Sequence, residues 1–271
     1  MRKFCGSIVK CAILSTLTLL VLSTKQQPQY GQGTPNPIEE QTRSLSRKYT
    51  QAQIDYFVEV ALGSEFGDSH TTIKKWDKDV RIKVLGSPTQ QDAKMLRTVI
   101  NEINSITDGV HLQLNSQNPN VTIYFVSESN FRKYEANYSP INLGFFWDLW
   151  KENNIIYNSK ILISIDGVTQ TERSHLIREE LTQSLGLMKD SYRYKDSVFY
   201  QGWTSVTQYA DIDKALIEML YRPEIRPGMT KSQVLQVLRT LDAKKESVPQ
   251  CEPTDVNPAL DFSIESCQPQ Q

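Results

Sequence analysis

The segment Ser174–Ser191, SHLIREELTQSLGLMKDS, decides the fold assignment. It continues a helical pattern from upstream, and Gly186 is a natural helix stop. Glu179 and Gln183 are spaced i, i+4 and therefore share one face of the predicted helix, with Glu180 beside them. Two side chains spaced in this way can hold one metal ion, and a neighbouring carboxylate can deprotonate a bound water. The segment therefore predicts a long helix that carries a polar site.

This spacing resembles the zinc-binding helix of the metzincin peptidases, His-Glu-x-x-His-x-x-Gly followed by a third His. On this sequence the three zinc-ligand positions fall on Glu179, Gln183 and Lys189, and the general-base position falls on Glu180. All three ligand positions have changed, whereas the glycine of the motif is kept as Gly186. The resemblance implies a zincin-like fold with an altered metal site, in which Glu180 is the candidate catalytic residue.

The similarity continues downstream of the helix. Metzincins carry a Ser-x-Met-Tyr turn beneath the metal, and here the segment Ser197–Tyr200, SVFY, places Phe199 at the Met position. Many metzincins then have a helix of the type Asp-Ile-x-x-Leu-x-x-Leu-Tyr, and DIDKALIEMLY ends here at Tyr221. Residues 75–222 therefore resemble a degenerate zincin of the metzincin type.

A narrower resemblance links the chain to the bacterial family named domain of unknown function 2927. Its members pair a Glu-Glu-x-x-Gln-x-Leu-Gly-Leu helix with a Leu-Tyr-x-Pro-x-Ile/Leu-x-Pro-Gly-Met segment. Both are present here, as Glu179–Leu187 and Leu220–Met229. The resemblance implies a fold and exported relatives, and it implies no established reaction.

Hydrophobic patterning predicts one α+β domain over residues 43–242. Alternation with a period of two predicts strands, and a period near 3.6 predicts helices. The predicted strands are 76–86, 111–114, 121–127, 143–147 and 153–167, and the predicted helices are 43–62, 87–107, 169–187 and 209–221. We expect a single zincin-like domain with a mixed twisted sheet, one early helix and two late helices packed below it, the first of these being the long motif-bearing helix.

The residues at the altered positions are poor zinc ligands. A neutral Gln amide binds zinc weakly, and Lys189 repels a cation. Asp190 could complete an oxygen set with Glu179 and Gln183, but such a set suits Ca²⁺ or Mg²⁺ better, and those ions usually need more ligands. His175 lies one turn before Glu179, so these two could also bind a metal; a solvent-facing His beside a carboxylate is the more common arrangement. We therefore expect no cofactor.

A structural role for the two glutamates is the leading interpretation. One of Glu179 and Glu180 can pair with Arg173 or Arg178 on the helix surface while the other faces a solvated cleft. A buried Glu–Gln hydrogen bond, within reach of Ser197–Tyr200, can hold the place where a metal once tied the helix to the loop. The alternative is hydrolysis by Glu180, with an atypical ion or without a metal.

The N-terminal residues 1–24 are predicted to be a secretory signal peptide, because a basic start precedes a short apolar run. An uncleaved membrane anchor is the alternative. Residues 25–42, rich in Gln, Pro and Gly, are an expected disordered linker, and residues 243–271 form a polar tail. In that tail Cys251 and Cys267 are expected to form a disulfide in an oxidising compartment. The protein is therefore predicted to be exported to a periplasm, to the cell surface or into the medium.

Other classes of function find little support. A net charge of −1 argues against a nucleic-acid partner. The sequence contains no Gly-x-Ser-x-Gly elbow, Walker A loop or Gly-x-Gly-x-x-Gly fingerprint. Phe145, Phe146, Trp147 and Trp150 could line a ligand groove, although core packing is the commoner role of large aromatic side chains. We expect an exported, zincin-like accessory module that binds an extended peptide or an envelope protein at the edge of its sheet, with a metallopeptidase-like hydrolase that uses Glu180 as the alternative.

Overall fold

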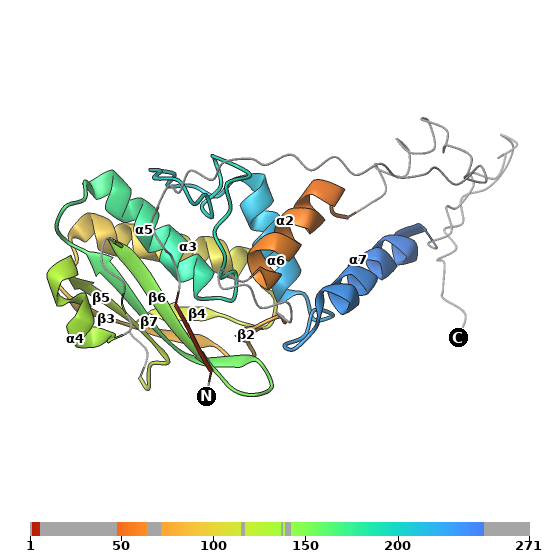
Figure 1. Ribbon diagram of the computed structural model, residues 1–271, viewed down its shortest axis with the longest axis horizontal. Coiled ribbons are helices and arrows are strands. Elements are labelled where there is room, and N and C mark those ends of the chain that lie inside the picture. The colour runs from red at the N-terminus through yellow and green to blue at the C-terminus, as the bar shows by residue number, and fades with distance from the viewer. Residues whose placement is uncertain are drawn as a thin grey trace, which may run out of the picture.

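The structure is a computed structural model that describes residues 2–5, 48–63, 72–114, 117–136, 138 and 142–246 (Figure 1). The predicted linker and the cysteines Cys251 and Cys267 lie outside the described residues. So does the predicted signal segment, apart from residues 2–5. Among the described helices, none combines the length and the apolar character that crossing a membrane requires.

The described strands form one mixed sheet of seven. Its parallel part is built, in order, from β4 (Leu112–Leu114), β3 (Val80–Gly86), β5 (Val121–Val126) and β7 (Ile155–Ser164). β6 (Gly144–Trp150) then runs antiparallel to β7, β1 (Arg2–Cys5) runs antiparallel to β6, and the short β2 (Lys75–Trp76) pairs with β7. The predicted mixed sheet is confirmed.

The described helices are α2 (Gln51–Leu62), α3 (Gln90–Ile106), α4 (Phe131–Tyr134) after the 3₁₀ turn η1 (Glu128–Asn130), α5 (Gln170–Gln183), α6 (Asp211–Tyr221) and α7 (Lys231–Glu246). Capping boxes fix three of the starts, because the hydroxyls of Thr50, Thr89 and Thr169 each accept the backbone N–H three residues on. α2 and α3 therefore begin later than hydrophobic periodicity predicts. α7 had no counterpart among the predicted helices.

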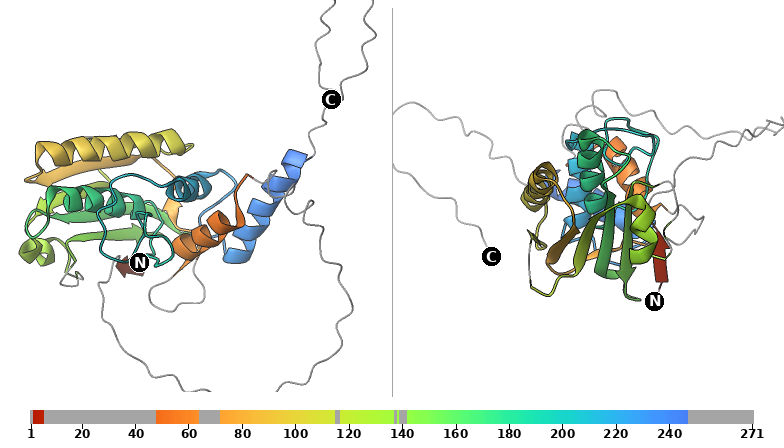
Figure 2. Two further views of the ribbon diagram at one scale, coloured as in Figure 1. Left: turned by 90° about the horizontal axis from the view of Figure 1, so that it is seen from above. Right: turned by 90° about the vertical axis from the view of Figure 1, so that its left-hand side faces the viewer.

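The helices are distributed over both faces of the sheet. α3 and α5 run side by side over one face (Figures 1 and 2), where the main core lies. On the other face a smaller cluster contains Phe131 of α4, Leu162 of β7, and Phe145 and Trp147 of β6. The remaining aromatic side chains of β6, Phe146 and Trp150, point into the main core. All four aromatic side chains of β6 are buried, so their predicted role in core packing is confirmed.

Candidate functional site

Helix α5 carries the motif, and all of it beyond the first turn is buried. Every residue of α5 from Arg173 to Gln183 is buried. The helix also approaches β6 closely, because a Cβ at Gly144 would lie 2.5 Å from Oε1 of Glu180 and 2.8 Å from Cδ2 of Leu176. A glycine at the start of β6 is therefore what allows the helix to pack against this strand.

Glu180, the candidate general base, lies in this close contact. Its side chain is only 1% exposed and packs against Gly144. The expectation that one of the two glutamates faces a solvated cleft is therefore wrong for Glu180. Glu179 is buried as well. Both glutamates are buried because α5 packs tightly on the sheet, and the hydrophobic periodicity of the sequence does not reveal this packing.

Glu179 pairs with the histidine one turn before it. Nε2 of His175 lies 3.3 Å from Oε2 of Glu179, and Nδ1 of His175 lies 2.7 Å from the carbonyl oxygen of Val206. Burial alone lowers the pKa of His175, but the Glu179 carboxylate and the bond to Val206 outweigh it, so the pKa is raised. The expected solvent-facing histidine is wrong, because the chain after α5 covers it.

Gln183 occupies the second ligand position, and its side chain is fully buried. Its amide nitrogen donates to the carboxylate of Asp190, so the expected Glu–Gln hydrogen bond is replaced by a Gln–Asp bond. The expected link to Ser197–Tyr200 is indirect. The neighbour of Asp190, Ser191, donates its backbone N–H to the carbonyl of Phe199 at 2.8 Å. The side chain of Gln183 thus ties the helix to the following loop as a metal would.

Lys189, at the third ligand position, contacts the end of α2 and not the other two ligand positions. Its backbone N–H donates to the carbonyl of Val60, and its side chain lies against Gly63 at the end of α2. The three ligand positions thus have separate partners. An amide that donates a hydrogen bond, a histidine-paired carboxylate and a lysine do not fit a zinc ion. Among the described residues no group of three or more His, Cys, Asp or Glu side chains is arranged to hold a metal.

The two arginines of α5 bind partners on another helix. Nε of Arg173 donates to Oδ1 of Asp92 at 3.0 Å, and the guanidinium of Arg178 pairs with Glu102. The Arg178 guanidinium also lies 4.2 Å from the centre of the Tyr209 ring. The predicted pairing of Arg173 or Arg178 with Glu179 or Glu180 is therefore wrong. Both acidic partners belong to α3, which sequence spacing along α5 cannot reveal.

The SVFY turn is held by a buried network that joins three segments. The hydroxyl of Tyr56 on α2 lies 2.8 Å from Oγ of Ser197, and Ser197 donates to Oδ1 of Asp213 on α6 at 2.6 Å. Asp213 also accepts the backbone N–H groups of Val198 and Ala210. Burial raises the pKa of Asp213 to about 6, although these hydrogen bonds oppose the shift. The network fixes the connection between α5 and α6.

A second buried carboxyl group lies on β6. Asp148 is fully buried and faces Ser159 across the strand pair with β7. Neither carboxyl oxygen of Asp148, nor the hydroxyl of Ser159, has a hydrogen-bond partner among the described residues. Burial raises the pKa of Asp148 well above its usual value, and nearby Ser159 opposes this only in part. The sequence does not reveal that Asp148 is buried, because a polar residue in a predicted strand is usually expected to face the solvent.

The helix with the Glu-Glu-x-x-Gln-x-x-Gly pattern thus packs beside the antiparallel strand β6 and ends in a glycine turn at Gly186, as the resemblance to metzincins predicts. The chain belongs to the family described as "Protein of unknown function (DUF2927)", which matches residues 50–240.

Two solved structures of myroilysin are similar to the chain. One is 10% identical, with a TM-score of 0.36, and the match covers 55% of this chain and 83% of that one. The other is 11% identical, with a TM-score of 0.35, and the match covers 55% and 86% of the two chains. No curated protein matches the sequence.

Replacing Gln183 with alanine is expected to destabilise the domain without creating any response to a chelator. The change removes the donor to Asp190 and costs about 1–3 kcal/mol, because it takes a partner from a buried acceptor. Thermal unfolding of the wild type and of Gln183→Ala, each with and without EDTA, measures both effects.

The matched control is Gln236→Ala on the exposed side of α7, which should leave the melting temperature unchanged. A large fall in wild-type stability on adding EDTA would mean that a bound metal contributes folding energy. That result would favour the hydrolase alternative.

Proposed function

We propose that this protein is an exported, non-catalytic binding module that takes up an extended peptide segment, such as an exposed segment of an envelope protein. The observation that carries this proposal is the internal pairing of the motif. Gln183 is fully buried and donates to Asp190, and Glu179 is paired with His175. Side chains engaged in this way are positioned to hold the helix and its loop together, which supports a structural role for the motif.

The edge of the sheet supports the binding part of the proposal. β6 is the antiparallel strand of the sheet, and its outer edge pairs with β1, the segment Arg2–Cys5 (Figure 1). The register runs from Arg2 opposite Trp150 to Cys5 opposite Trp147. The backbone of β6 can therefore accept an extended antiparallel segment, and removal of a signal peptide over residues 1–24 would open this edge to a peptide from another chain.

The test is hydrogen–deuterium exchange on the chain that lacks residues 1–24. The probe is a synthetic peptide of residues 1–8 with Cys5→Ser. We expect the peptide to slow amide exchange within residues 144–150, because main-chain hydrogen bonds supply the affinity. We also expect to recover the peptide intact, because the proposed module is non-catalytic.

The matched control is the same peptide with alternate backbone nitrogens methylated, which cannot form the ladder and should give no protection. Equal protection by both peptides, or protection confined to another surface, would contradict edge pairing. Cleavage of the peptide that disappears in Glu180→Gln would contradict the non-catalytic role instead.

A further inference from the structure

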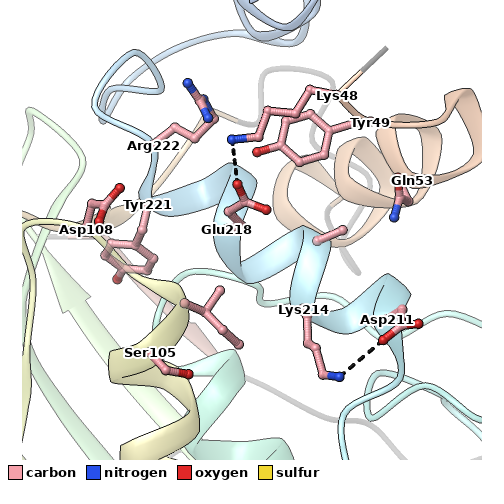
Figure 3. Close-up of a pocket in the computed structure, with 12 residues that line it drawn as sticks. Lys48, Tyr49, Gln53, Ser105, Asp108, Asp211, Lys214, Glu218, Tyr221 and Arg222 are labelled. Atoms are coloured by element: carbon pink, nitrogen blue, oxygen red, sulfur yellow. Dashed lines mark hydrogen bonds and ion pairs between the residues drawn. The ribbon is translucent and has the colours of Figure 1, made fainter. Parts of the chain in front are cut away.

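A polar pocket lies where α2, α3 and α6 meet, and none of the motif residues of α5 lines it (Figure 3). It has a volume of about 470 Å³ and lies between the start of α2, the C-terminal end of α3 and one face of α6. That face presents Asp211, Lys214 and Glu218, whose spacing keeps them on one side of the helix, and Arg222 follows directly after the end of α6. The volume falls in the range of small-molecule sites.

The charges that line the pocket balance. Three cations (Lys48, Lys214, Arg222) stand against three anions (Asp108, Asp211, Glu218). Lys48 pairs with Glu218 at 2.7 Å, Lys214 pairs with Asp211 at 3.2 Å, and Arg222 pairs with Glu224 outside the pocket at 3.1 Å. Asp108 forms no ion pair within the described part of the chain. Asp108 is therefore the one lining charge without an ion pair in the described part of the chain, and a ligand that carries an ammonium group and a carboxylate can pair with it without adding net charge.

Two buried polar atoms of the pocket residues lack partners. The hydroxyl of Tyr49, a residue only 3% exposed, and Nε of Arg222 have no hydrogen-bond partner among the described residues. Burial raises the pKa of Tyr49, and the Arg222 guanidinium beside it opposes the rise, so the two groups lie side by side although neither the hydroxyl nor Nε meets the geometry of a hydrogen bond. In Figure 3 this hydroxyl points toward the ion pair of Lys48 and Glu218. Both members of that pair are about 40% exposed, so the pair contributes little and can open at low cost.

We propose that this pocket binds a small zwitterion, a free α-amino acid or a dipeptide. Its carboxylate would accept hydrogen bonds from the Tyr49 hydroxyl and from Nε of Arg222, with Lys48 moving from Glu218 to the ligand. Its ammonium group would lie beside Asp108, close to the C-terminal end of α3, where the helix dipole favours a cation. The site is separate from the edge of β6 and does not rest on the function proposed above.

The test is isothermal titration calorimetry of the full-length chain with L-alanyl-L-alanine. We expect binding that weakens by about tenfold or more in Arg222→Gln, because a charge-assisted hydrogen bond is lost, and by about fivefold in Tyr49→Phe. The matched control is Arg226→Gln, an exposed arginine outside the pocket, which should bind as the wild type does. Thermal unfolding checks that each variant is folded, and Tyr49→Phe carries the test if Arg222→Gln is not.

Two further probes decide the ligand class. N-acetyl-L-alanyl-L-alanine methylamide, which lacks both charges, and acetate, which lacks the ammonium group, should each bind far more weakly than the dipeptide. Equal binding of either probe, no binding of the dipeptide, or equal effects of Arg222→Gln and Arg226→Gln would each overturn the proposal.

Discussion

Replacing Gly186 with alanine is expected to destabilise the domain severely, because the added methyl group meets the backbone of another segment. Gly186 has φ +114°, and a Cβ at this position would lie 2.0 Å from the carbonyl oxygen of Lys74. That oxygen is backbone just before β2, so no side-chain rotation can relieve the overlap. We expect a loss of more than about 4 kcal/mol, seen as a fall in melting temperature of about 10 °C or more.

The matched control for this change is Gly109→Ala. Gly109 also has a positive φ, +77°, but nothing lies within 4 Å of the position its Cβ would take. Its cost is therefore limited to the left-handed backbone, about 1–2 kcal/mol. Similar losses in the two variants would show that the contact with Lys74 has no importance for the fold.

The second large effect is a pH dependence of stability that originates at Asp148. Its pKa in the folded state is raised well above the usual value by burial. The folded protein therefore holds a proton that the unfolded chain releases near pH 4. The stabilisation is complete below that pH and falls as the pH rises toward the folded pKa, by about 1.4 kcal/mol per pH unit. Asp213, with a folded pKa of about 6, acts in the same direction between pH 4 and 6.

Asp148→Asn removes this proton without changing the size of the side chain. Urea unfolding at several pH values between 4 and 6 should show a slope that is smaller by about 1.4 kcal/mol per pH unit than in the wild type. Lys75, whose pKa burial lowers to about 8, titrates outside this window. Asp77→Asn, at an exposed position, is the control and should keep the wild-type slope. Parallel curves for wild type and Asp148→Asn would exclude a buried, protonated Asp148.

The sequence alone was sufficient for the fold class, because long periodic segments and the motif order survive in the chain. The strand residues Ile161, Leu162 and Ile163 alternate between two cores, and a period of two predicts such an arrangement. β2 has only two residues and α4 only four, so both are too short to show a hydrophobic periodicity, and the sequence did not predict them.

The site was harder to predict, because its partners are distant in sequence. Spacing along one helix correctly places His175 next to Glu179, one turn away. It cannot place Asp92 beside Arg173 or Asp213 beside Ser197, because tertiary packing brings these pairs together. Burial was the other missing quantity. Glu180 and Asp148 are hydrophilic in the sequence, and only the approach of α5 to β6 and the depth of β6 in the sheet make them interior residues.

The network of Tyr56, Ser197 and Asp213 has a consequence for how the molecule opens. The connection between α5 and α6 has little regular structure, and a segment of that kind would ordinarily fluctuate as a surface lid. Here it is fastened to α2 and α6 by buried hydrogen bonds and to α5 by the carbonyl of Val206. These segments should therefore open as one cooperative unit, and the amide protons of the irregular connection should exchange about as slowly as those of the helices around it.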